Sequence, residues 1–451
     1  MPRTIRLTLG LALVAVFGIL GTPPTFAQPD EERSVSDSIA GSLVAHGFEH
    51  VAVETGENLV SVWFENRIYR YDMTSLGVVA ALAGAGLDAD TVLELIPENR
   101  GVPVTAVSAP AGQWLAFLDG RVGENDFRSQ LQIRLGSRRN GAPLAYSGDT
   151  RQNPAYLRTD FAVRPIFGFT LGIGFDVFSY NLSLAPELTM SPFHGGLITL
   201  QVAIALHDDF ETKGFDPVQG RLCTEAEPCG RTVKPVRNTI SWGGWLPGNW
   251  LAATSAGIFP GDRYGFSGQV GRLFLDGQLD VWAKGDLTGL LEFKDDHIAY
   301  SNLEQWTAYG AVTHRLRGLD LESTLRAGRF REGRAAVRFD LERRYKEFEA
   351  GFFGAKNKDE TVFGFTLRIP LPVKHYSDPA RFRLVTVPAF PFVYEDKIDA
   401  SVARPVGFVA LEARQFDDLD RLRKRLYPTF IMNNIEDLRL ANAYLPAGDA
   451  P

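Results

Sequence analysis

The segment HGFEH, His46 to His50, matches the H-x-x-E-H spacing in which two histidines hold zinc and a glutamate acts as base. That chemistry needs both histidines and the glutamate on one continuous helix. Gly47 stands where the preceding helical pattern ends, so the segment is predicted to join a helix to a strand. We therefore predict no metal site here, and no cofactor.

The two cysteines, Cys223 and Cys229, lie in the polar segment RLCTEAEPCGR. Two close cysteines in an exported protein most often form a local disulfide. A structural zinc site needs about four ligands, and no histidine is near in sequence. We predict a disulfide, with two free thiols as the alternative.

Other chemical motifs are sparse. DDH, Asp295 to His297, offers ligands for a cation, but its setting between two strand-like segments is typical of a polar turn. The chain has no G-x-S-x-G elbow, no phosphate-binding G-x-x-x-x-G-K-[ST] and no dinucleotide fingerprint. We predict no catalytic residues; the alternative is a hydrolase whose Ser, His and acidic groups are scattered along the chain.

The segment SWGGWLPGNW carries three tryptophans, Trp242, Trp245 and Trp250. Indole rings stack on sugar faces, and they also gather in the interfacial girdle of membrane proteins, where one edge is apolar and one is wet. The girdle is our interpretation and sugar stacking the alternative. The two roles are compatible near the mouth of a barrel.

These residues must be positioned by long alternating segments. In LDVWAKGDLTGLLEF, Leu279 to Phe293, every second residue is apolar, which is the period of a strand. A soluble strand averages about five or six residues, whereas one that crosses a bilayer needs about nine to eleven. Similar segments run from Phe127–Leu135 to about residue 415, and we count roughly 10 to 14 of them.

Alternation fits both a soluble sandwich, with its apolar face inside, and a transmembrane antiparallel β-barrel, with its apolar face in lipid. Strand length, an export signal and aromatic residues at strand ends favour a barrel in the outer membrane of a Gram-negative bacterium. The polar faces would then line the lumen and offer weak binding positions for a hydrated polymer, with mutual pairing as the alternative. These positions are Asp280, Lys284, Arg326, Arg338, Asp340, Glu342 and Arg368.

The remaining sequence sets the organisation of the chain. A basic start, an apolar core and small residues predict a signal peptide over 1–27, cleaved after Ala27. Net charge is −7 without a long Lys/Arg run, which excludes nucleic acid as the main partner. We predict a small periplasmic α+β domain over 34–120, the barrel over 125–415, and a short helical periplasmic tail over 416–451, interrupted at Pro428.

Three stretches together resemble a known family. LVAHGFEHVAVETGENLVSVWFENRIYR resembles the GF-x-x-V strand and ENR-x-YR turn of the YjbH/GfcD exopolysaccharide family. The stretch from LRTDFAVRP to GGLITLQVAI resembles its early barrel hairpins, and the stretch from RAGRF to FTLRIPLP resembles its late strands. The resemblance covers most of residues 36–372. It implies an outer-membrane β-barrel with a small periplasmic domain, associated with secretion of exopolysaccharide, capsule or biofilm matrix.

The expected function is thus that of a non-enzymatic outer-membrane β-barrel that assists export or surface assembly of a polysaccharide. Its expected partners are outer-membrane lipid, the polysaccharide chain, and periplasmic components of an export system. Two alternatives stay open: a barrel hydrolase acting on lipid or glycan, and a soluble periplasmic carbohydrate-binding β-sandwich.

Overall fold

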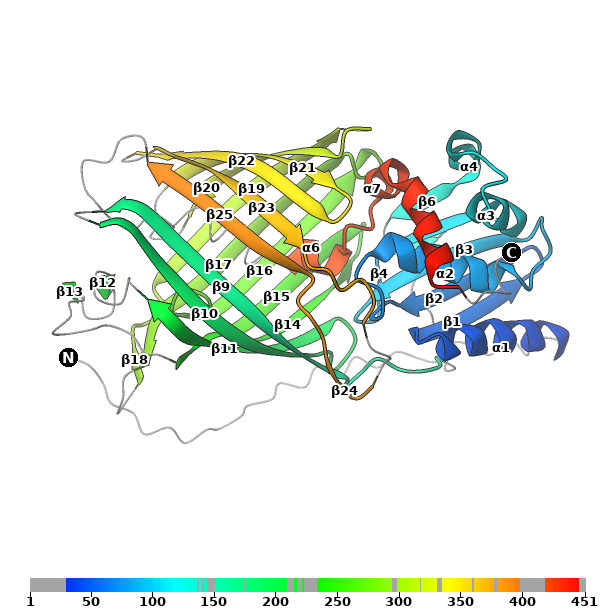
Figure 1. Ribbon diagram of the computed structural model, residues 1–451, viewed down its shortest axis with the longest axis horizontal. Coiled ribbons are helices and arrows are strands. Elements are labelled where there is room, and N and C mark those ends of the chain that lie inside the picture. Colours follow the sequence, from blue (N-terminus) through cyan, green and yellow to red (C-terminus); the bar gives the residue numbers. More distant parts are fainter. Residues whose placement is uncertain are drawn as a thin grey trace.

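The computed structural model is mainly β, as predicted, and contains a small mixed domain beside a large antiparallel sheet (Figure 1). Among the residues that it describes, no helix is long and apolar enough to cross a membrane. The described residues are 30–135, 138–139, 142–143, 151–173, 176–208, 215–216, 221–222, 233–293, 298–316, 318–330, 335–358, 361–376, 380–397 and 418–445.

The small domain is built on a six-stranded sheet in the order β1-β2-β3-β5-β6, with β4 paired to β3. Strands β2 and β3 are parallel and the other neighbours are antiparallel. The strands are β1 (Glu49–Gly56), β2 (Leu59–Glu65), β3 (Val92–Asn99), β4 (Val102–Pro103), β5 (Thr105–Pro110) and β6 (Gln132–Leu135).

Four helices contribute to an apolar core that lies against this sheet. Helix α1 ends at Ala45, and Gly47, with a φ of +102°, lets the chain turn into β1, as the sequence predicts for HGFEH. The four helices are α1 (Asp30–Ala45), α2 (Asp72–Gly84), α3 (Ala111–Leu118) and α4 (Glu124–Gln130).

One strand prediction is wrong. Phe127–Leu135 was expected to begin the run of long strands, but Phe127 lies on α4 and β6 belongs to the small sheet. Phe127 and Leu131 are four residues apart, a spacing that suits one face of a helix as well as a strand. The core resolves the ambiguity, because the Phe127 ring stacks on Phe117 at 4.4 Å between ring centroids.

The C-terminal tail forms α6 (Asp418–Arg423), α7 (Pro428–Asn433) and the 3-10 helix η3 (Ile435–Ala443). Pro428 begins α7, where its missing N–H costs nothing. The tail is not a separate appendage: Ile431 and Leu438 are buried in the core of the small domain. Gly77 of α2 permits this approach, because a Cβ there would lie 2.2 Å from the carbonyl oxygen of Leu438.

The large sheet has 15 strands in the order β24-β9-β10-β11-β14-β15-β16-β17-β19-β20-β21-β22-β23-β25, with β18 on β17. Two further two-stranded ladders join β7 (Arg138–Arg139) to β8 (Ala142–Pro143), and β12 (Phe215–Asp216) to β13 (Arg221–Leu222). The strands of the large sheet are β9 (Thr159–Ile173), β10 (Asp176–Met190), β11 (Gly196–Asp208), β14 (Val233–Leu246), β15 (Trp250–Phe259), β16 (Arg263–Phe274), β17 (Leu279–Phe293), β18 (Ile298–Tyr300), β19 (Gln305–Leu316), β20 (Leu321–Arg329), β21 (Ala335–Tyr345), β22 (Phe348–Asn357), β23 (Thr361–Pro370), β24 (Phe382–Leu384) and β25 (Ala389–Lys397).

The sheet curls until its first and last long strands, β9 and β25, lie side by side (Figure 1). On the side of β9 away from β10, only the short β24 pairs with β9 among the described residues, in parallel, from Phe382↔Thr159 to Leu384↔Phe161. Over the described residues, no ladder joins β9 to β25, so hydrogen bonding does not close the sheet.

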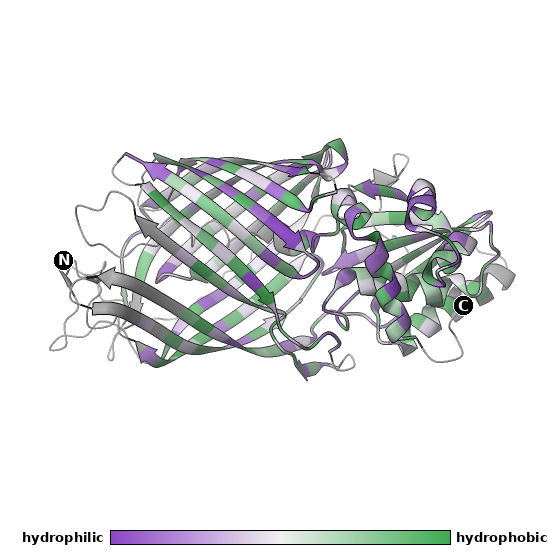
Figure 2. Ribbon diagram, turned by 45° about the horizontal axis from the view of Figure 1, so that its top comes forward, coloured by the Kyte–Doolittle hydropathy of each residue, from purple (hydrophilic) through white to green (hydrophobic). Residues whose placement is uncertain are grey.

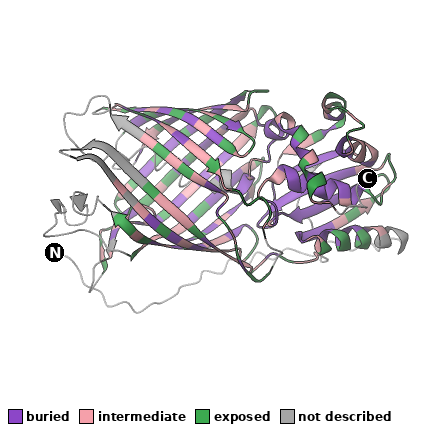
Figure 3. Cartoon of the chain, in the orientation of Figure 1, coloured by how far each residue is buried: buried purple, intermediate pink, exposed green. Residues whose placement is uncertain are grey.

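Burial alternates along the long strands, and it does so with polar residues inside (Figures 2 and 3). On β21, Arg338 and Asp340 are 0% and 2% exposed, whereas Val337 and Phe339 are 49% and 47% exposed. We call the face that carries Arg338 the concave face and the face that carries Val337 the convex face. The sheet therefore buries polar side chains and exposes apolar ones, the reverse of a soluble sandwich.

Candidate functional site at the junction of the small domain and the large sheet

Three buried glutamates lie side by side on neighbouring strands, at one end of the strands of the small sheet. Glu49 is the register partner of Glu65, and Glu65 is the register partner of Glu98. Each is at most 4% exposed. Adjacent carboxylates in a low-dielectric setting are unfavourable unless cations and N–H donors compensate them.

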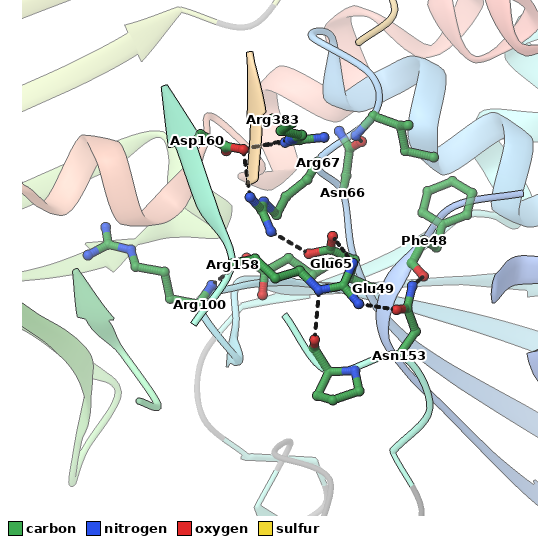
Figure 4. A network of polar contacts seen from close by, with 12 residues as sticks. Phe48, Glu49, Glu65, Asn66, Arg67, Arg100, Asn153, Arg158, Asp160 and Arg383 are labelled. Atoms are coloured by element: carbon green, nitrogen blue, oxygen red, sulfur yellow. Dashed lines mark hydrogen bonds and ion pairs between the residues drawn. The ribbon is translucent and has the colours of Figure 1, made fainter. Parts of the chain in front are cut away.

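Arginines compensate the two outer glutamates; Figure 4 shows those around Glu49. Glu49 accepts hydrogen bonds from Arg67 and Arg158, both at 2.9 Å. Arg151 binds both carboxylate oxygens of Glu98, at 2.5 and 2.8 Å. Arg151 and Arg158 belong to the segment that leads from the small domain into β9, so these ion pairs fix its path.

Backbone donors compensate the central glutamate. Glu65 accepts hydrogen bonds from the N–H groups of Arg100 and Gly101, at 3.1 and 3.2 Å. Both residues have positive φ, +58° and +76°, in the turn between β3 and β4. A Cβ at Gly101 would lie 2.8 Å from Tyr156 Oη and 3.1 Å from His194 Nδ1. The turn therefore needs glycine both for its backbone conformation and for space.

The same network continues into the large sheet. Arg67 donates to Asp160 of β9 at 2.7 Å as well as to Glu49. Arg383 of β24 binds the two oxygens of Asp160 at 2.5 and 3.2 Å. A continuous chain of charges thus links β1 of the small domain to the place where β24 meets β9.

Burial shifts the pKa values of the two outer glutamates. Burial raises the pKa of Glu49, although Arg67 opposes the shift. Burial likewise raises the pKa of Glu98 to about 7, against the effect of Arg151. The Glu98 carboxyl therefore changes its charge near neutral pH.

His50 lies next to the glutamate row and is 1% exposed. Among the described residues, neither of its ring nitrogens has a hydrogen-bond partner. Its ring packs edge-on against Tyr156 at 4.4 Å, and burial lowers its pKa to about 4. Burial also lowers the pKa of His194, which lies in the turn between β10 and β11.

The structure separates the members of the H-x-x-E-H pattern. His46 Nε2 lies 2.6 Å from Tyr69 Oη, the His50 ring packs against Tyr156 instead, and Glu49 is held by arginines. Among the described residues, no group of three or more His, Cys, Asp or Glu side chains is placed to hold a metal.

Four of the seven predicted lumen positions fall into two clusters. Arg338 binds Asp340 at 2.6 Å, and Arg326 also contacts Asp340. Asp280 instead contacts Arg423 of the tail and lies 3.5 Å from Arg315. Lys284 is buried on the same concave face, whereas Glu342 and Arg368 are half-buried, with Arg368 3.9 Å from Glu349. Mutual pairing, the alternative raised from the sequence, accounts for Asp280, Arg326, Arg338 and Asp340.

The three tryptophans do not share one face. Trp242 and Trp250 occupy positions in register with the convex face and are half-buried. Trp245 instead packs against a buried cluster on the concave side and donates a hydrogen bond to the carbonyl oxygen of Pro103 at 2.7 Å. Trp245 is therefore part of the contact with the small domain.

The junction residues were not identified from the sequence as a site. The available signal was the segment ENRIYR, in which Asn66 binds the Tyr69 carbonyl oxygen at 2.8 Å and Arg70 binds Glu347 at 2.6 Å. Arg67 of the same segment provides the link to Asp160.

Several predicted features lie outside the described residues: the cleavage site at Ala27, the cysteine pair Cys223 and Cys229, and the segment Asp295 to His297. No protein-family model matches the chain, and no curated protein matches it.

Proposed function

We propose that the large sheet is an outer-membrane β-barrel that assists export or surface assembly of exopolysaccharide, with the small domain in the periplasm. The observation that carries the membrane assignment is the reversed burial on β21. There Val337 and Phe339 are exposed while Arg338 and Asp340 are buried.

The same arrangement extends over neighbouring strands. Soluble proteins rarely expose contiguous apolar patches larger than a few hundred Å². Here, large apolar side chains that are 42–71% exposed occur on six consecutive strands, β17 and β19 to β23: Leu287, Trp306, Val312, Leu325, Val337, Phe339, Phe352 and Phe363. Hydrocarbon around the convex face explains this pattern, whereas the soluble sandwich would bury those residues.

Closure of the barrel is part of the proposal. In lipid, every backbone N–H and C=O must find a partner, so an open sheet edge is costly. β24 already pairs in parallel with β9, and β25 lies beside β9 and follows β24 directly. We expect this parallel seam to extend along β9 in the bilayer.

A polysaccharide as cargo is supported by the resemblance to the exopolysaccharide family and by the chemistry of the concave face. Ser241, Ser255, Ser267, Asp286 and Thr307 are register partners across five strands. Ser255 donates to Ser241 at 2.9 Å, and Thr307 donates to Asp286 at 2.7 Å. A row of four hydroxyl groups and one carboxylate suits a hydrated, hydroxyl-rich chain, and the junction offers periplasmic export components a rigid attachment.

The test is a deletion strain that is scored for secreted and periplasmic polysaccharide. We expect secreted polysaccharide to fall and the wild-type chain to restore it. Unchanged secretion would contradict the proposal. Turnover of glycan or lipid by purified protein, lost on substitution of one Ser or His, would instead favour the hydrolase.

A further inference from the structure

Helix α6 of the tail lies against the concave face of the large sheet, at the end next to the small domain (Figure 1). Leu419 and Leu422 are each 1% exposed. They join a buried cluster with Leu251 of β15, Trp282 of β17 and Val102 of β4. Both leucines of α6 are therefore buried in this contact.

Two glycines on the concave face make room for the helix. A Cβ at Gly243 would lie 2.9 Å from Leu422 Cδ2. A Cβ at Gly271 would lie 3.1 Å from Leu419 Cδ1. These positions on β14 and β16 form a seat in which the two leucines approach the backbone of the sheet.

Polar and charged contacts attach the end of α6 and the residues after it to further strands of the large sheet. Arg423 contacts Asp280 of β17, and Arg425 contacts Glu349 of β22. The Tyr427 hydroxyl then contacts Glu322 of β20. Residues 419–427 therefore touch strands from β14 to β22, which lie on different sides of the curved sheet.

The small domain holds the tail from the other side. Asn99 Nδ2 donates to the carbonyl oxygen of Leu422 at 3.0 Å, and Lys424 Nζ donates to the carbonyl oxygen of Asn66 at 3.0 Å. Asn66 directly follows β2 and Asn99 is the last residue of β3, beside the glutamate row. The position of the tail is thus coupled to the junction.

We infer that residues 418–427 are a plug that closes the domain-facing mouth of the barrel, and that passage of cargo requires its displacement. The inference rests on the proposed barrel and adds its regulation. Displacement would expose two buried leucines and remove one of the cations beside Asp280, so the closed state is the resting one. A periplasmic partner that moves the small domain would pull on the plug through Asn66 and Asn99.

A disulfide across the seat tests the inference. The variant Gly243→Cys/Leu422→Cys, in a background with Cys223→Ser and Cys229→Ser, is purified, oxidised and reconstituted in planar bilayers. Leu419→Ala/Leu422→Ala is the loosened counterpart, and each single cysteine variant is a control. We expect channel steps from the loosened protein, none from the crosslinked protein, and no effect of oxidation on the single cysteine variants.

Channel steps from the crosslinked protein would overturn the plug, as would a folded loosened variant that conducts no more than wild type. Heat-modifiable migration of the same samples on SDS gels separates this failure from failure of the barrel. If the samples migrate as folded barrels, the conductance result concerns the plug alone; if none does, the proposed function itself is wrong.

Discussion

Arg67 of the small domain lies 2.7 Å from Asp160 of the first long strand of the large sheet. The same guanidinium binds Glu49 at 2.9 Å, and the same carboxylate binds Arg383 of β24 at 2.5 Å. One pair of residues thus connects the small domain to the place where the two ends of the curled sheet meet.

Replacing Arg67 should therefore weaken the junction. In Arg67→Ala, Glu49 and Asp160 each lose a cation, and breaking a buried ion pair typically costs about 3 to 5 kcal/mol. We expect a loss of about 3 kcal/mol in the free energy of unfolding, measured by denaturant titration in detergent. The control is Arg121→Ala, because Arg121 is 65% exposed in its pair with Asp119 and should change little. Equal losses in the two variants would contradict the network.

His50 should make stability sensitive to acid. Its pKa is about 4 in the folded protein and about 6.5 when unfolded, so the unfolded chain binds more protons between these values. The contribution of His50 to the free energy of unfolding is full above pH 6.5. It is lost as the pH drops toward 4, by about 3 kcal/mol in total. His50→Asn, which tolerates the positive φ of 54°, should flatten this slope in unfolding curves.

The His50 comparison is best made in a Glu98→Gln background. The raised pKa of Glu98, about 7, gives a contribution of opposite sign, present at low pH and lost as the pH rises toward 7. If the free energy of unfolding falls equally steeply toward acid pH with and without His50, another group causes the fall.

Gly101→Ala should separate backbone strain from steric conflict. A positive φ costs a non-glycine residue about 1 to 2 kcal/mol. Gly120 has a similar φ, +78° against +76°, but no atom of the described part of the chain lies within 4 Å of a Cβ there. We expect Gly101→Ala to lose clearly more stability than Gly120→Ala, because only the former meets Tyr156 and His194. Equal losses would mean that these side chains move aside freely.

Leu287→Arg tests the environment of the convex face. Leu287 is 42% exposed on β17. In water such a change is nearly neutral, whereas near a bilayer midplane it costs about 2 to 4 kcal/mol. We expect that loss when folding into lipid vesicles is titrated. Leu319→Arg, at a 55% exposed position between β19 and β20, is the control and should have little effect.

The sequence sufficed for the long strands, because alternation over Leu279–Phe293 is a local signal and the structure has β17 over the same residues. It failed at Phe127, where four-residue spacing suits two structures and only packing decides. It also failed at the junction. Glu49, Glu98 and Arg158 lie far apart in sequence, and only strand register and the path of the chain bring them together.

The tail shows the same limit. Helices near Pro428 were predictable from local composition, but their place was not. Leu419 and Leu422 meet β14 and β16 across the opening of the sheet, and Ile431 completes the core of the small domain. Such contacts depend on how the whole sheet curls.

The most direct test of the central claim is cell fractionation of the mature protein, followed by SDS gels of heated and unheated samples. The barrel predicts recovery in the outer-membrane fraction and faster migration of the unheated protein. Recovery in the soluble periplasmic fraction, with no change on heating, would contradict it and leave the carbohydrate-binding sandwich as the better account.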